Sequence, residues 1–288
     1  MIGLLYALLS PILYGIVNVY DKFVVEHRVK NHRSYAVFSG AAILLFSIIT
    51  ALFLDWGNIR PEYLIFPVIT GTISGINSWL YYKIISKEDI SHVVGMIYIY
   101  PLIVSALSFL FIGEKLSIIG YFGALITITG AVLLSSKIKN IKKGIFFFLG
   151  ILIINVGISE FLIKIVTGNI PAVNGMVISN ICVAIVLLSG LLVKEIRTGA
   201  FNEKKSAYLA LIGEPFYFFG SMMLFLAMSD LPATIVSSIS AIQPLVVLIF
   251  ESIINKHFRI SSSEHLKDKI IAISLIILGV VLLYVTEI

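Results

Sequence analysis

Long apolar segments, separated by short polar stretches, recur along the whole chain of 288 residues. Each segment is about 18–23 residues long, which is the length that a helix needs to cross the ~30 Å hydrocarbon core of a bilayer. The apolar residues run continuously instead of alternating with polar ones, and this excludes a membrane β-barrel. The pattern predicts ten helices, at Gly3–Val24, Ser34–Leu54, Tyr63–Ile85, Ser91–Ile112, Ile118–Ser135, Gly144–Val166, Ala172–Val193, Ala207–Met228, Ala233–Ile254 and Ile270–Thr286.

Composition supports the same class. Hydrophobic residues make up 59% of the chain and charged residues 13%, whereas soluble domains have roughly 45–50% and 25%. One globular core cannot bury this much apolar surface, so we expect an all-α integral membrane protein in contact with lipid. The formal net charge is +5, but the basic residues lie between the apolar segments rather than on one face. They therefore indicate membrane topology, and we expect no nucleic-acid partner.

The two halves of the chain resemble each other. The stretch HVVGMIYIYPLIV, which ends at Val104, is similar to TIVSSISAIQPLVV, which ends at Val247. Further matches pair Pro101 with Pro244, Lys22 with Lys164, Gly3 with Gly144 and Gly130 with Gly279. The repeat predicts two five-helix units, residues 1–140 and 141–288.

A unit with an odd number of helices ends on the opposite side of the membrane from where it began. Two such units in one chain are therefore inserted upside down relative to each other. Inverted repeats of this kind are typical of secondary transporters, in which exchange of conformations between the halves gives alternating access.

The distribution of basic residues predicts the orientation. Of the 21 Lys and Arg residues, 18 fall on the side that holds the loops after the first, third, fifth, seventh and ninth segments. The other side has only Arg60, Lys115 and Lys164. Because cytoplasmic loops are enriched in Lys and Arg, we expect a multi-pass protein of the cell membrane with both termini outside.

Two stretches resemble a known family. YGIVNVYDK, from Tyr14 to Lys22, is similar to the first-helix pattern of EamA-type members of the drug/metabolite transporter superfamily. The stretch from Trp79 to Leu134 resembles the third-to-fifth-helix signature of that family. The matching residues are the tyrosines, Pro101, the Gly-Glu-basic triplet Gly113, Glu114 and Lys115, and the glycines Gly123 and Gly130.

This resemblance implies a ten-helix transporter with a central cavity for amino acids, other metabolites or drugs. Two features depart from the family. Asn255, Lys256 and His257 stand where a second Gly-Glu-basic triplet would recur. The family also implies cytoplasmic termini, opposite to the orientation that the basic residues predict.

Glu214 is the most deeply placed ionisable residue, near the middle of Ala207–Met228. A charged group at that depth costs at least ~2.5–3.5 kcal/mol and therefore indicates function. Gly213 and Pro215 on either side weaken the helix and could open its backbone to a cavity, and Tyr217 lies on the same face. We interpret Glu214 as a site for a proton or a cationic substrate; the alternative is a carboxylate paired with another helix.

Glu160 has two interpretations of equal weight. Lys164 follows it at the i,i+4 spacing that favours a local ion pair, and such a pair would be structural. Without that pair, Glu160 is a second candidate binding or coupling residue. Asn18 and Lys22 occupy the same relative positions in the first half, so the negative charge lies in the second half, and Asn18 joins the candidate site.

The segments Ser91–Ile112 and Ala233–Ile254 carry polar side chains around their prolines. Tyr98, Ser240 and Gln243 are the candidate substrate-binding residues there. A proline within a helix removes a backbone hydrogen bond, so we interpret Pro101 and Pro244 as hinges at mid-helix. The small-residue face of Tyr63–Ile85 is interpreted instead as a packing surface.

Other chemistry is not indicated. The five histidines lie at segment ends or in loops without a metal-binding motif, and one cysteine cannot form an internal disulfide. No P-loop, dinucleotide-binding turn or nucleophile elbow occurs, so we expect no metal, no cofactor and no ATP hydrolysis within the chain.

The sequence therefore predicts a secondary active transporter of small organic solutes, and we favour an exporter of amino-acid-like or amphipathic metabolites. The alternative within transport is proton-coupled uptake of a sugar or related metabolite. An intramembrane enzyme is disfavoured because the polar residues are too dispersed. The expected partners are a small-molecule substrate, the lipid bilayer and, as a candidate coupling ion, the proton.

Overall fold

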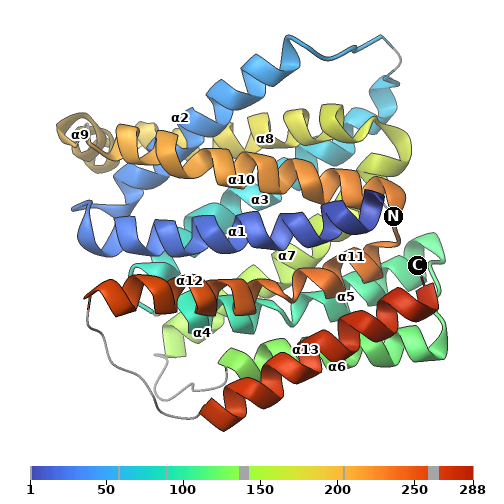
Figure 1. Cartoon of the computed structure of the whole chain (residues 1–288). Coiled ribbons are helices and arrows are strands. Elements are labelled where there is room, and N and C mark those ends of the chain that lie inside the picture. Colours follow the sequence, from blue (N-terminus) through green and yellow to red (C-terminus); the bar gives the residue numbers. More distant parts are fainter. Residues whose placement is uncertain are drawn as a thin grey trace.

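The computed structural model describes residues 2–57, 59–88, 90–135, 143–203, 205–258 and 266–287, and within these ranges the chain is helical without strands. Figure 1 shows a bundle of long helices with both termini at the same end. The described elements of the first half are α1 Ile2–His27, α2 His32–Ala51, η1 Pro61–Leu64, α3 Ile65–Ile85, α4 Ile90–Ile97, α5 Tyr100–Leu107, η2 Ser108–Ile112 and α6 Ile118–Ser135. Those of the second half are α7 Lys143–Asn169, α8 Ala172–Leu188, η3 Ser189–Leu192, α9 Lys194–Asn202, α10 Lys205–Asp230, α11 Ala233–Ser240, α12 Gln243–Phe258 and α13 Leu266–Glu287.

Within the described ranges, six helical segments are long and apolar enough to cross a membrane, and three shorter apolar helices accompany them. The protein is thus an all-helical, multi-pass membrane protein. The ten predicted apolar segments all coincide with helical regions. The short helix α9 was not predicted; it has an amphipathic sequence, buries Ile196 and Ala200, and lies between α8 and α10.

The helices pack in corresponding ways in the two halves. Helix α1 packs along α10, and α7 packs along α3. Helix α2 contacts α8 and α10, while α8 contacts α2 and α3. Helices α6 and α13 pack on each other and form a separate layer, which lies at the bottom of Figure 1.

Glycines allow the closest of these contacts. A Cβ atom on Gly71 would lie 2.1 Å from the carbonyl oxygen of Ser179 on α8, and one on Gly75 would lie 2.6 Å from Val186. The two glycines of the small-residue face of α3 therefore have the predicted packing role, whereas Ser74 and Ser78 of the same face line an internal cavity. Between α6 and α13, a Cβ atom on Gly123 would lie 3.0 Å from the carbonyl oxygen of Gly279.

The two predicted hinge prolines do not lie at mid-helix, which corrects the prediction. Each follows a break between two helices, so Pro101 is the second residue of α5 and Pro244 is the second residue of α12. The turn between α4 and α5 contains Ile99, and the turn between α11 and α12 contains Ile242, 143 positions later. A proline ring clashes with the carbonyl group four residues earlier, so the helix stops before each proline.

The backbone hydrogen bonds at the two breaks also correspond. The amide of Ile99 donates to Met96 over three residues instead of four, and that of Ile242 donates to Ile239 in the same way. The structure therefore places equivalent interruptions in the two segments that the repeat had paired.

Candidate functional site

A cavity of about 230 Å³ lies inside the bundle. Its wall is formed mainly by α1, α3, α7, α8 and α10, with single residues from α2 and α4. Three carboxyl groups line it, those of Asp21, Glu160 and Glu214, and among the described residues no Lys, Arg or His does. The ion pairs formed by the described residues do not include any of these three groups. The cavity therefore offers negative and polar groups in an otherwise apolar wall.

Glu214 lies where the sequence predicted, buried in α10 with 1% of its surface exposed. The hydroxyl group of Tyr82 is 3.4 Å from Glu214 Oε1 and 3.0 Å from Ser39 Oγ, so its single proton can be donated to either acceptor. A hydrogen-bonding group from another helix thus faces the carboxyl group, and no basic residue does within the described chain.

The neighbours of Glu214 have a different role from the one predicted. Helix α10 continues without interruption through Gly213 and Pro215. A Cβ atom on Gly213 would lie 2.7 Å from the ring of Tyr20, so this glycine allows close packing of α1 on α10. The expected local opening of the helix is not seen.

Asp21 is a site residue that the sequence analysis missed. It is 4% exposed, lines the cavity, and accepts a 2.7 Å hydrogen bond from the Tyr35 hydroxyl group. The rings of Tyr35 and Tyr82 pack edge to face with centroids 5.5 Å apart. Asp21 and Glu214 therefore belong to one polar cluster between α1, α2, α3 and α10. The spacing of Tyr14, Asn18 and Asp21 on one helix face was the signal that could have identified it.

Glu160 also lines the cavity, and it does not form the local ion pair with Lys164 that was one of its two interpretations. The ammonium group of Lys164 donates instead to the carbonyl oxygens of Met228 and Leu231. Its ion-pair partner is Glu114, at 3.8 Å. Glu160 is 9% exposed, and its Oε2 atom has no hydrogen-bond partner among the residues that the structure describes.

Asn18 and Tyr217 are two further predicted residues on the cavity wall. The hydroxyl group of Tyr81 donates to Asn18 Oδ1 at 3.0 Å. The ring of Tyr217 packs edge to face with that of Tyr14, with centroids 5.7 Å apart. Four predicted site residues thus meet at the cavity with Asp21.

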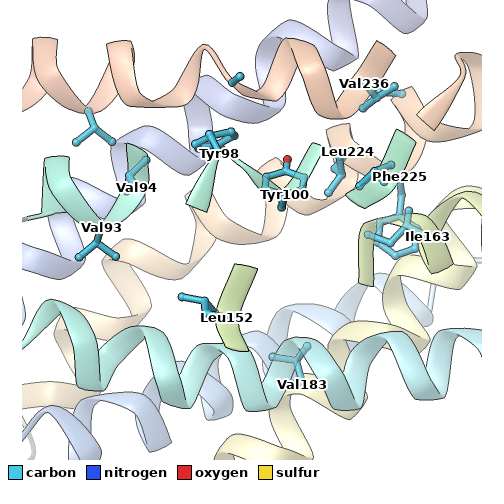
Figure 2. Close-up of a cluster of buried hydrophobic side chains, with 14 of the residues drawn as sticks. Val93, Val94, Tyr98, Tyr100, Leu152, Ile163, Val183, Leu224, Phe225 and Val236 are labelled. Atoms are coloured by element: carbon cyan, nitrogen blue, oxygen red, sulfur yellow. The ribbon is translucent and has the colours of Figure 1, made fainter. Parts of the chain in front are cut away.

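The other three predicted binding residues lie outside the cavity wall. Tyr98 donates a hydrogen bond to the side-chain oxygen of Gln243 where the broken segments α4–α5 and α11–α12 cross. Figure 2 shows Tyr98 beside the gap in the ribbon between α12 and α11. Ser240 donates at 3.0 Å to the carbonyl oxygen of Val236 in its own helix. Tyr98 and Gln243 thus connect the two breaks.

The Gly-Glu-basic triplet forms a connection between the halves. Gly113 has φ +68°, in the left-handed region that favours glycine. The following turn places both oxygens of Glu114 at 2.9 Å and 3.2 Å from the backbone N–H group of Ala233, in the first turn of α11. Lys164 of α7 is the second partner of this carboxylate. A negative group at a helix N-terminus is stabilised by the free N–H groups there.

The described residues contain no group of three or more His, Cys, Asp or Glu side chains that could hold a metal ion. What the site provides is a hydrophobic enclosure with hydrogen-bonding tyrosines, serines, asparagines and carboxyl groups. Such a wall can bind a small organic solute, and its carboxyl groups can accept a proton or a cation. The fold and the site together define a multi-pass membrane protein with an acidic internal cavity.

Comparison with known proteins supports the family resemblance in the first half of the chain. Residues 1–136 match the EamA-like transporter family, and this confirms the resemblance that the first-helix pattern and the Gly-Glu-basic triplet indicated. A protein of known crystal structure has a similar fold, with a TM-score of 0.66 and 14% sequence identity. The similarity covers 96% of this chain and 98% of that one, so the fold of the whole chain is shared. No curated protein matches the sequence.

Proposed function

We propose that this chain is a secondary active transporter that moves small organic solutes across the cell membrane by alternating access, and that it works as an exporter of amino-acid-like or amphipathic metabolites. The observation that carries the proposal is the cavity between the two halves, which has three carboxyl groups and no basic residue on its wall. The family match supports a membrane transporter of small solutes. Apolar and aromatic lining residues suit a solute with an apolar body, and the carboxyl groups suit an amine.

Alternating access requires two halves that can exchange conformations, and the packing supports such halves. In the proposed topology the ten spans are α1, α2, α3, α4–α5–η2 and α6 in the first unit, and α7, α8, α10, α11–α12 and α13 in the second. The contact of α1 with α10 then corresponds to that of α7 with α3, and the contact of α1 with α11 and α12 corresponds to that of α7 with α4 and α5. These pairs are the ones that a two-fold axis in the membrane plane would relate.

The residues of the proposed mechanism follow from the geometry. Glu214 and Asp21 would exchange protons with the solvent while the bound solute occupies the cavity. The breaks before Pro101 and Pro244 would let the spans α4–α5 and α11–α12 change their angle as the cavity opens to one side and then to the other. Nothing in this scheme requires bond chemistry, which is why transport is favoured over an intramembrane enzyme.

Purified protein in liposomes tests the function. Uptake of labelled amines and amino-acid derivatives is measured with a proton gradient in either direction and without one. A proton antiporter should accumulate solute when the lumen is acidic, and a proton-coupled importer should do so when the outside is acidic. Flux that equals that of empty liposomes under every gradient would contradict the proposal.

A further inference from the structure

Four polar atoms on cavity-lining side chains have no hydrogen-bond partner within the described ranges. They are Thr70 Oγ1, Asn77 Oδ1, Glu160 Oε2 and Asn180 Nδ2. All four side chains are at least nine-tenths buried, from 1% exposed for Thr70 to 9% for Glu160. Native proteins rarely leave buried polar atoms unpaired. A solute in the cavity is a natural partner for a set of such atoms gathered along one wall.

The four residues come from three helices that pack on one another. Thr70 and Asn77 lie two turns apart on α3, Glu160 is on α7 and Asn180 is on α8, and α3 contacts both α7 and α8. This α3–α7–α8 junction differs from the cluster around Glu214, where Tyr35 and Tyr82 face the carboxyl groups. The α3–α7–α8 junction therefore keeps unused hydrogen-bonding capacity, although the Glu160 carboxyl group, like those of Asp21 and Glu214, has a hydrogen bond to a tyrosine, here Tyr100.

The unpaired atoms define the chemistry of a ligand. A carboxylate oxygen and an amide oxygen only accept hydrogen bonds, so Glu160 and Asn77 require a donor. The amide nitrogen of Asn180 only donates, so it requires an acceptor, and the Thr70 hydroxyl group can act either way. An ammonium group next to a carbonyl or hydroxyl oxygen satisfies this set.

The charge of the cavity restricts the ligand further. A free carboxylate on the solute would find no basic residue on the described wall to pair with, and Asp21, Glu160 and Glu214 would repel it whenever they are ionised. Repulsion between like charges in a poorly solvated site is strong. The acceptor on the solute should therefore be uncharged.

We propose that the α3–α7–α8 junction binds an organic amine that carries an uncharged carbonyl or hydroxyl group close to its nitrogen, with the ammonium group at Glu160 and the acceptor at Asn180. The apolar body of the ligand would lie against wall residues such as Leu152, Leu224 and Phe225, whose side chains are labelled in Figure 2. This inference rests on the proposed function and narrows its substrates from amino-acid-like solutes to amines without a free carboxylate.

Three related ligands test the site by calorimetry on the purified protein at pH 6.5. They are phenylalaninamide, which has the amine and a neutral carbonyl group, phenylalanine, which has a free carboxylate, and 2-phenylethylamine, which lacks the acceptor. We expect phenylalaninamide to bind at least about tenfold more tightly than phenylalanine, with 2-phenylethylamine between them. Tighter binding of phenylalanine than of its amide would overturn the proposal, as would undetectable binding of phenylalaninamide at 10 mM.

Two variants assign the contacts. Glu160→Gln should weaken both amines about tenfold or more, since a charge-assisted hydrogen bond is lost. Asn180→Leu should weaken phenylalaninamide and leave 2-phenylethylamine unchanged. Glu62→Gln, an exposed carboxyl group remote from the cavity, is the matched control and should change neither affinity. Unchanged affinities in Glu160→Gln would overturn the assignment; if that variant does not fold, the wild-type ligand order and Asn180→Leu decide the question.

The same ligands separate this inference from the proposed function. If the ligands bind in the expected order but show no flux in liposomes, the binding site is supported and the proposed transport function is contradicted. If amines are transported with an unchanged KM in Glu160→Gln, the transport function is supported and the binding site is contradicted.

Discussion

Lys22 and Lys164, which the repeat pairs, make the same contact in the two halves of the chain. The ammonium group of Lys22 donates to two carbonyl groups at the C-terminal end of α3, both at 3.1 Å, and that of Lys164 donates to two at the C-terminal end of α10, at 2.9 Å and 2.8 Å. The accepting residues are Ile85 and Glu88 for Lys22, and Met228 and Leu231 for Lys164. A cation at a helix C-terminus satisfies carbonyl groups that have no partner within the helix.

The ion pairs of these two lysines differ. Lys22 pairs with Glu26 on its own helix at 3.3 Å, where the carboxylate is half-exposed. Lys164 pairs with Glu114 from the other half of the chain, and both side chains are mostly buried. At the end of the bundle that holds the termini, Glu114 of the first half thus binds Lys164 and the N-terminus of α11, both from the second half.

Lys164→Met should therefore destabilise the protein. It removes the ion pair with Glu114 and leaves two carbonyl groups without a donor, at a cost of about 1–3 kcal/mol. Unfolding of the purified protein in detergent by SDS measures the change. Lys115→Met, which removes an exposed lysine next to Glu114 in the chain, should have no comparable effect. Equal stability of the two variants would show that the contacts of Lys164 with Glu114 and with the end of α10 do not contribute to the free energy of unfolding.

Glu214→Gln should abolish the pH dependence of transport or net transport itself. Glutamine keeps the shape of the side chain but cannot exchange a proton, so only Asp21 of the proposed proton-exchanging pair would remain. Uptake into liposomes from pH 5.5 to 8.5 gives the profile. If Glu214 only holds its helix in place, Gln would accept the same hydrogen bond from Tyr82, and an unchanged profile would end its assignment as a coupling residue.

Pro101→Ala and Pro244→Ala should each slow transport without unfolding the protein. Alanine supplies the backbone N–H group that proline lacks, so the residue can donate to Ile97 or Ser240 and join the two helices at the break. Flux and thermal stability are compared with Pro61→Ala, which alters a surface turn outside the long helices. Normal rates in both variants would mean that the breaks do not move during transport.

Gly71→Ala should be strongly destabilising, because its new methyl group would lie 2.1 Å from a carbonyl oxygen of α8. Overpacking of this kind costs about 1–3 kcal/mol. Gly150→Ala is the matched control, since a Cβ atom there meets nothing within 4 Å, and alanine is the better helix former. Thermal unfolding should lower the midpoint for the first variant and leave or raise it for the second.

Cysteine labelling in intact cells tests the orientation, starting from Cys182→Ser. A cysteine added after Ile288 should react with a membrane-impermeant thiol reagent, and one at Ser136 should not, because the 18 basic residues predict an outward C-terminus. Ser136 and the linker that follows it lie outside the described residues. Reaction at Ser136 alone would show that the termini are cytoplasmic, as the family resemblance implies.

The helices and the family resemblance could be predicted from the sequence because each depends on local pattern. Apolar segments of sufficient length predicted the helices, and the triplet at Gly113 indicated the resemblance that the match over residues 1–136 confirms. The position of Asp21 could not be predicted in this way, since it lies near the end of the segment Gly3–Val24, next to Lys22, and looks like a surface residue until α1 is packed on α10. Tyr98 and Gln243 were misplaced for the converse reason: their helix positions are polar, but they contact each other and not the cavity.

Glu160 shows a further limit. Its spacing from Lys164 is suitable for an ion pair, and only tertiary structure reveals that the lysine contacts the end of α10 and Glu114 instead. A sequence pattern shows which ion-pair partners are available within one helix. It does not show whether a side chain will bind such a partner or one from another helix.

Helices α6 and α13 contribute no residue to the described cavity wall. The described wall comes from four spans of the first half and three of the second, so the fifth span of each half adds nothing to the contacts with a solute. The fifth span makes the number of spans in each half odd. Without α6 the second half would be inserted in the membrane with the same orientation as the first, and the two halves could not form an inverted pair. In the proposed topology, a helix that never meets the transported molecule determines that the protein has two alternately accessible sides.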